Sequence, residues 1–222
     1  MCIRDRLYRF FVSPTLNEDV VNELANQFQV DFELEPILRR LFKSEHFFDE
    51  EAMATLIKSP YDIQINMLKV TGFPITDEQK ETMLAQNNII GQEFYQPVDV
   101  AGWQGDYDWV NSATLVGRWE FTLTIVNATN DEDSNRLRDF AKEASNNSRN
   151  VEEIVRSIID AFIPRGLNTE TDYEIAIDEF KGEVPESFFE EGGAWDLDFE
   201  TVPSQVQILF QYLVTLPEFQ LK

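Results

Sequence analysis

Apolar residues recur at helical spacing along most of the chain. Leu34, Ile37 and Leu41 belong to one such stripe, and the segments 151–162 and 202–216 carry others. This spacing places the apolar side chains of each segment on one face of a helix, which a core then covers. The pattern predicts an all-α fold, an irregular bundle of many helices.

Capping residues indicate where several of these helices begin. Ser59 stands directly before a proline, and Thr76 is followed three residues later by a glutamine. The first arrangement is typical of an N-cap and the second of a capping box. Thr15 precedes Glu18 at the same spacing, so we expect it to open the next helix, which contains residues 20–28.

Helical periodicity is lost in three segments. Residues 90–111 carry glycine, proline, aspartate and aromatic residues in the proportions of a loop, and residues 182–201 form a second, acidic and aromatic loop. Long loops without periodicity are uncommon, and they usually have a function or pack against the body of the protein. Residues 127–150 are polar and rich in asparagine, with one helical patch at residues 137–144, which predicts a surface excursion or a linker.

The loop at residues 90–111 contains the strongest candidates for a binding site. Its aromatic side chains Trp103, Tyr107 and Trp109 are candidate stacking surfaces. Lys58 and Arg118 lie on flanking helices, from which we expect both side chains to reach the loop. Cations beside aromatic rings favour a carboxylate or an acidic sugar as ligand. The alternative is that Arg118 pairs with a loop aspartate and pins the loop to the body.

Two aspartates of the same loop are candidate metal ligands. Asp106 and Asp108 flank Tyr107, and their carboxylates together with backbone oxygens suit a calcium ion. The further acidic positions of an EF-hand are absent from the sequence, so the competing interpretation is that both residues cap turns. His46 is the only histidine, and we interpret it as a surface or interhelix residue rather than a metal ligand. No other cofactor is expected.

The charge of the chain limits the partners to consider. The formal net charge is -23, whereas binding to nucleic acid or to an anionic membrane surface requires a basic face. No apolar run approaches the ~18 residues of a membrane span. The sequence therefore predicts a chain without a membrane span that does not bind nucleic acid.

The first six residues, MCIRDR, resemble a translated sequencing adaptor of the kind found at the ends of metagenomic fragments. We expect residues 1–6 not to be native, and residues 7–222 to form a single helical domain that is the C-terminal fragment of a longer protein. Setting the six residues aside removes Cys2, the only cysteine. Disulfides and thiolate zinc sites are then excluded for the rest of the sequence.

An ordered set of short motifs resembles a known family. The motifs are LYRFFVS, LRRLFKSEHFF, KSP, VAGW, WVNSATL followed by Arg118, and LPEFQ, in register over the chain after Leu7. With them the chain resembles the C-terminal part of the domain of unknown function family 1800. The resemblance implies a largely helical bacterial protein, exported to the periplasm or the extracellular space, and it supplies no agreed activity.

Two functions stay open, one catalytic and one not. The sequence contains no glycine-rich phosphate loop, no HExxH and no GxSxG motif. The favoured hypothesis is an exported binding or assembly module whose Trp-rich loop contacts a protein or a glycan. The alternative is the C-terminal half of a metal-dependent hydrolase that acts on an extracellular polymer, with its catalytic residues mostly upstream.

Overall fold

The fold is helical throughout the described part of the chain. A computed structural model describes residues 3–103, 105–127, 130–190 and 192–222. These residues form ten α-helices and no β-sheet, which confirms the predicted all-α class. The helices are α1 (Ile3–Phe11), α2 (Glu18–Asp31), α3 (Leu34–Phe42), α4 (Pro60–Thr71), α5 (Asp77–Ile89), α6 (Ser112–Ile125), α7 (Asp131–Ala144), α8 (Val151–Phe162), α9 (Glu170–Lys181) and α10 (Val202–Leu213).

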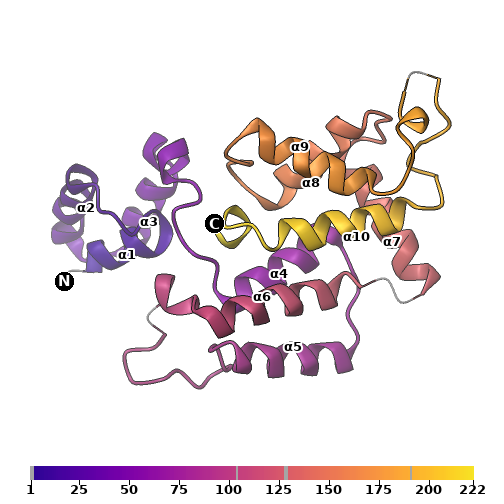
Figure 1. Ribbon diagram of the computed structural model, residues 1–222. Helices are drawn as coiled ribbons and strands as arrows, with labels where there is room; N and C mark the ends of the chain where they lie inside the picture. Colours follow the sequence, from indigo (N-terminus) through magenta and orange to yellow (C-terminus); the bar gives the residue numbers. More distant parts are fainter. Residues whose placement is uncertain (1–2, 104, 128–129, 191) are drawn as a thin grey trace. The chain divides into compact units, whose positions relative to one another are not determined.

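The chain divides into two compact units. Unit 1 comprises Met1–Leu56 with Leu221–Lys222, and unit 2 comprises Ile57–Gln220. In unit 1, α2 packs against both α1 and α3 (Figure 1). The three helices enclose a small core, to which Val12, directly after α1, also contributes. Its buried residues are Tyr8, Val12, Val21, Leu24, Ile37 and Leu41. Whether residues 7–222 act as one domain stays a prediction.

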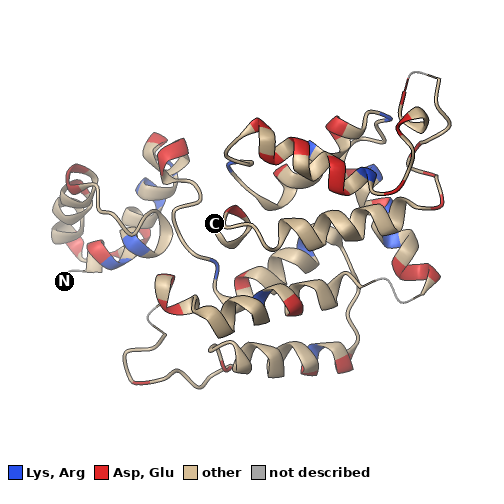
Figure 2. Ribbon diagram, in the orientation of Figure 1, with Lys and Arg blue, Asp and Glu red and all other residues tan. Residues whose placement is uncertain are grey.

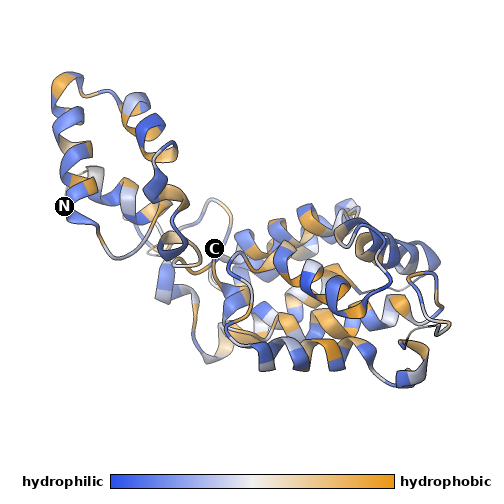
Figure 3. Cartoon of the chain, turned by 90° about the horizontal axis from the view of Figure 1, so that it is seen from above, coloured by the Kyte–Doolittle hydropathy of each residue, from blue (hydrophilic) through white to orange (hydrophobic). Residues whose placement is uncertain are grey.

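Helix α10 is the central element of unit 2. It packs against α6, α7 and α9, while α4 packs against α5, α6, α7 and α8 (Figure 1). The helices carry hydrophobic and hydrophilic positions side by side, as amphipathic helices around a core do (Figure 3). Fully buried side chains from α8 and α10, among them Ile158, Leu209 and Phe210, lie in this core. No helix in the described ranges has the length and apolar character that crossing a bilayer requires.

Local capping explains most of the helix starts. Ser59 accepts a hydrogen bond from the amide of Asp62 and completes a capping box, and Thr76 does the same with Gln79, as predicted. The prediction for Thr15 is wrong by two residues. Asn17 is the N-cap of α2, because its side-chain oxygen accepts from the amide of Val20.

The prediction of a surface excursion at residues 127–150 is also wrong, although its helical patch at residues 137–144 is confirmed. Most of that segment is helix α7, which packs against α8 and α10. Leu137, Phe140 and Ala141 are buried in the core of unit 2, on one face of an otherwise polar helix. Three apolar residues at helical spacing suffice to bury one face, whatever the composition of the rest.

The two predicted long loops are confirmed. Between α5 and α6, the described residues contain only the short 3-10 helix η3 (Asp106–Trp109), and between α9 and α10 only η4 (Glu186–Phe188). Helices α5 and α6 approach closely where the first loop begins. A Cβ atom on Gly117 of α6 would lie 2.6 Å from the Cγ2 atom of Ile90, so glycine at this position allows the contact.

Candidate binding loop

The second half of the loop at residues 90–111 is fixed to helix α6. Asn111 accepts hydrogen bonds through its side-chain oxygen from the amides of Ala113 and Thr114, both at 3.0 Å. The Thr114 hydroxyl donates in turn to the carbonyl oxygen of Trp109 at 3.0 Å. The Trp109 ring is buried at the same place. This end of the loop is therefore held both by a helix cap and by the core.

The first half of the loop is fixed to helices α4 and α5. The Gln92 amide donates to the carbonyl oxygen of Asn87 at 2.8 Å, and the Gln92 side-chain oxygen accepts from the Tyr61 amide at 3.1 Å. The Phe94 and Tyr61 rings meet edge to face, with centroids 5.8 Å apart. Both ends of the loop are thus anchored to the helices of unit 2.

Large apolar side chains project into solvent between these anchors. Tyr95 and Val98 are 84% and 86% exposed. The rings of Phe94 and Tyr95 lie against each other at a centroid distance of 4.1 Å. The exposed apolar residues of the loop, here called the loop patch, are Phe94, Tyr95, Val98, Val100 and Tyr107. Because several such residues gather in one segment, the loop patch has the character of an interaction surface.

The backbone of the loop patch is strained at one aromatic residue. Tyr95 has a φ of 61°, a left-handed conformation that a bulky side chain rarely adopts. Such strain costs free energy and is found most often at functional sites. It presents the Tyr95 ring to solvent at the point where the loop leaves its contact with α4.

The surroundings of the loop patch are acidic. Residues 81–117 contain no lysine and no arginine, while the loop itself contributes Glu93, Asp99, Asp106 and Asp108. Figure 2 shows acidic and uncharged positions, without basic ones, along the connection between α5 and α6. The loop patch therefore combines apolar side chains with negative charge.

The three predicted stacking residues lie in different environments. Tyr107 is exposed and belongs to the loop patch. Trp103 is half-buried, and its indole N–H has no hydrogen-bond partner among the described residues. Trp109 lies in the interior, so the expectation that its ring serves as a stacking surface is wrong. Its side chain anchors the loop instead.

The expectation that Lys58 and Arg118 reach the loop is wrong. The Lys58 ammonium donates to the carbonyl oxygens of Phe162 at 3.1 Å and of Phe219 at 2.9 Å. Arg118 is 1% exposed; its Nε donates to the Gln220 side-chain oxygen at 2.9 Å and its Nη2 to the Lys58 carbonyl oxygen at 2.6 Å. Both cations lie inside unit 2, where they hold the C-terminal residues. The alternative pairing of Arg118 with a loop aspartate is likewise not formed.

Burial changes the acid–base behaviour of this interior arginine. Desolvation lowers the pKa of Arg118 to about 10, and the nearby Asp62 carboxylate opposes that effect. The guanidinium is nevertheless charged at neutral pH. Its charged N–H groups donate the hydrogen bonds to the two oxygen acceptors.

Among the described residues, the two candidate calcium ligands belong to no larger cluster of metal-ligating side chains. Asp106 is half-buried and Asp108 is exposed, both within η3. In the residues that the structure describes, no three His, Cys, Asp or Glu side chains converge as metal ligands. Calcium binding by these aspartates stays a prediction. His46 lies in unit 1, where its Nε2 is 2.7 Å from the Tyr8 hydroxyl and its ring stacks on that of Tyr8.

The residues that sequence reasoning missed are the first members of the loop patch. Phe94, Tyr95, Val98 and Val100 lie in a non-periodic segment, where apolar residues have no helical face to bury them. Apolar side chains in an anchored loop are the signal that points to them. The candidates taken from the sequence were only Trp103, Tyr107 and Trp109.

Comparison with known proteins gives a match to a protein family. The family described as "Protein of unknown function (DUF1800)" matches residues 1–221, which is nearly the whole chain. Neither the curated proteins nor the solved structures include a match to the sequence. The motifs quoted above and this match agree with each other, and the chain therefore belongs to the DUF1800 family.

Proposed function

We propose that the chain is an exported binding or assembly module, and that the loop patch binds a protein segment carrying apolar and basic side chains. The observation that carries the proposal is the loop patch itself, a set of exposed apolar side chains on a segment anchored at both ends. The proposal of export rests on the resemblance to the family, because proteins of that family commonly carry export signals. No observation on the described residues favours a hydrolase.

Covering the loop patch supplies the binding energy. Full burial of one large apolar side chain contributes about 1.5–3 kcal/mol. Burial of two or three such side chains therefore offsets a large part of the free-energy cost of association. Aromatic residues are enriched in the centres of interfaces, and Phe94, Tyr95 and Tyr107 provide three. The anchors hold these residues in place before the partner arrives, which reduces the entropy lost on binding.

Charge selects the partner. The loop contributes four carboxylates and no cation, and the whole chain carries a formal net charge of -23. Complementary charge increases the association rate and suppresses partners of like charge. A protein segment with lysine or arginine beside its apolar residues matches both the apolar side chains and the negative charge of the loop, whereas an acidic glycan matches neither.

Selection of peptides from a displayed random library on the immobilised full chain tests the proposal. We expect the bound peptides to be enriched in lysine, arginine and large apolar residues. A synthetic peptide from the selection should bind at least about tenfold more weakly to the double variant Tyr95→Ser/Val98→Ser, because two apolar contacts are lost. The control is Ile175→Ser, which removes an exposed apolar side chain from α9.

Two results would contradict the proposal. One is enrichment of acidic or purely polar peptides, which would disagree with the charge of the loop. The other is equal loss of affinity in the double variant and in Ile175→Ser, which would place the contact elsewhere. Circular dichroism of each variant verifies that the helices are intact.

A further inference from the structure

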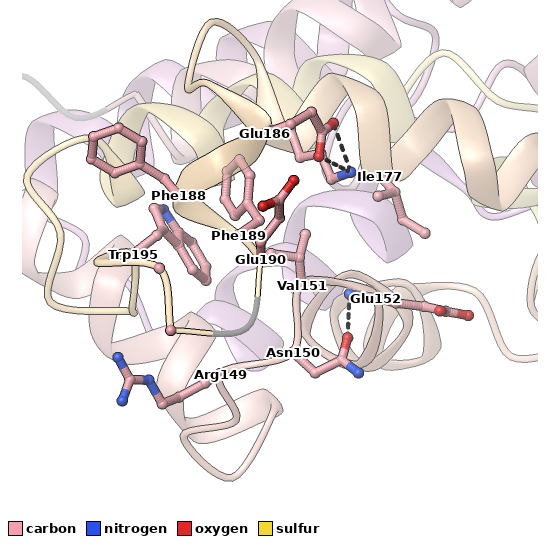
Figure 4. A pocket seen from close by; sticks show the side chains of 13 residues that line it. Arg149, Asn150, Val151, Glu152, Ile177, Glu186, Phe188, Phe189, Glu190 and Trp195 are labelled. Atoms are coloured by element: carbon pink, nitrogen blue, oxygen red, sulfur yellow. Dashed lines mark hydrogen bonds and ion pairs between the residues drawn. The ribbon is translucent and has the colours of Figure 1, made fainter.

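Unit 2 also contains a groove whose lining residues are not part of the loop patch. It has a volume of about 670 Å³ and lies between the start of α8, the end of α9 and the loop at residues 182–201. Figure 4 shows its side chains, among them Arg149, Phe188, Phe189, Glu190 and Trp195. This volume is within the range of small-molecule and side-chain binding sites.

The wall of the groove is preformed. Trp195 is buried, and its indole N–H donates to the Gln205 side-chain oxygen at 3.0 Å. The Trp195 amide donates to the carbonyl oxygen of Phe188 at 3.2 Å. Gly193 lies so close to the same carbonyl group that a Cβ atom would be 2.2 Å from its oxygen. The loop is therefore packed tightly on itself and presents Phe188 and Phe189 half-buried to the groove.

The basic side chains of the groove are already paired with acids. The Lys181 ammonium lies 3.0 Å from a carboxylate oxygen of Glu186, and the Arg149 guanidinium 3.7 Å from one of Asp196. The Lys181 ammonium also lies 5.8 Å from the centre of the Phe189 ring. This geometry demonstrates that a cation is accommodated beside that ring.

One acidic side chain of the groove has no basic partner among the described residues. Glu190 is exposed; its carbonyl oxygen accepts from the Gly193 amide at 2.8 Å, but its carboxylate makes no hydrogen bond or ion pair with the residues that the structure describes. Glu190 lines the groove together with Phe188 and Phe189, whose side chains Figure 4 shows. The groove therefore combines aromatic rings with one carboxylate that has no basic partner among the described residues.

We propose that this groove binds an organic cation, an ammonium or guanidinium group on an apolar stem, with Glu190 as its counter-ion. The aromatic rings of Phe188 and Phe189 accept the stem, and ring faces attract the cation electrostatically. An anion is repelled by Glu190 and by the net charge of the chain, and a neutral polyol gains nothing from the unmatched carboxylate. The site is independent of the loop patch.

Titration of the full chain with pentylammonium chloride tests this site, with 1-pentanol as the neutral probe of similar shape. The readout is the NMR signal of the Trp195 indole N–H, assigned with Trp195→Phe. We expect a saturable shift with pentylammonium and none with pentanol. Glu190→Gln should weaken binding about tenfold, through loss of the counter-ion.

The matched control is Glu183→Gln, an exposed acid of the same loop that does not line the groove. It changes the net charge equally, so it measures general attraction of cations, and we expect an affinity within about twofold of the native chain. Equal shifts with pentanol, equal weakening by both substitutions, or no saturable shift would each overturn the proposal. The Tyr95→Ser/Val98→Ser variant should bind pentylammonium like the native chain.

Discussion

Arg118 and Gln220 are joined by a hydrogen bond of 2.9 Å between Nε and the side-chain oxygen, although 102 residues separate them in the sequence. A second hydrogen bond joins Arg118 to the carbonyl oxygen of Lys58. The arginine therefore connects three distant segments of unit 2. Its role in this structure is to hold the C-terminal residues, and the loop between α5 and α6 is anchored by other groups.

Substitution of this arginine should destabilise the fold. In Arg118→Met, both oxygen acceptors lose a charged donor, and we expect the free energy of unfolding to fall by about 2–4 kcal/mol. Urea denaturation followed by circular dichroism measures the change. Arg165→Met, at an exposed position, serves as control and should change the value by less than about 0.5 kcal/mol. Equal stability of the two variants would contradict the role given to Arg118.

The contact between Gly117 and Ile90 predicts a specific coupling. Gly117→Ala should destabilise the chain by about 1–3 kcal/mol, because the new methyl group overlaps the Cγ2 atom of Ile90. Ile90→Ala removes that atom. The double variant should be more stable, by at least about 1 kcal/mol, than the sum of the two single losses predicts. Denaturation of the four proteins measures it, and Gly117→Ala combined with Ile65→Ala should be additive.

The cap of α6 should control the order of the loop end. Asn111→Ala removes the acceptor for two amides and should cost about 1 kcal/mol, whereas Asn111→Asp keeps the acceptor. Hydrogen exchange at the amides of Ala113 and Thr114 measures the effect directly. Faster exchange in the alanine variant, and near-native exchange in the aspartate variant, are expected. Unchanged protection in Asn111→Ala would mean that the cap does not fix the loop.

The pair of Arg136 and Glu143 predicts a pH dependence. The Arg136 hydrogen bond lowers the pKa of Glu143 below its ordinary value of 4.5. A carboxyl group with a lowered pKa in the folded state contributes stability above the unfolded pKa, and this contribution is lost as the pH falls through the folded pKa. Because Glu143 is exposed, the contribution is below about 1 kcal/mol.

Glu143→Gln should therefore lower stability at pH 7, and its difference from the native chain should shrink as the pH falls below 4.5. Denaturation curves across this range test the expectation. Glu174→Gln, at an exposed position of α9, should show no such trend. A Glu143→Gln difference that is constant with pH would exclude the ion pair as its source.

Features that depend on neighbouring residues were predictable from the sequence. The caps at Ser59 and Thr76 involve only residues within one helical turn, so the local sequence indicates them, although the same pattern placed the start of α2 two residues too early. The two long loops were found in the same way, because periodicity ends where the helices end.

Features that depend on tertiary packing were not predictable. The direction of the Arg118 side chain depends on Gln220, and the burial of Trp109 on the helices that surround it. Only the second half of helix α7 was predicted as helical, and its packing was missed because composition averages over its faces, whereas only the face of Leu137 and Phe140 reaches the core. The sequence indicated where the loop lies, and packing determined which of its aromatic residues face solvent.

The Lys58 amide donates to the carbonyl oxygen of Gln220 at 2.7 Å, so the chain enters and leaves unit 2 at the same point. Joining these two ends with a short linker would require little rearrangement. New termini at the exposed turn of Asn146 and Asn147, which follows α7, would then give a circular permutant with the same helix contacts. The same closure suits the unit for insertion into a surface loop of another protein.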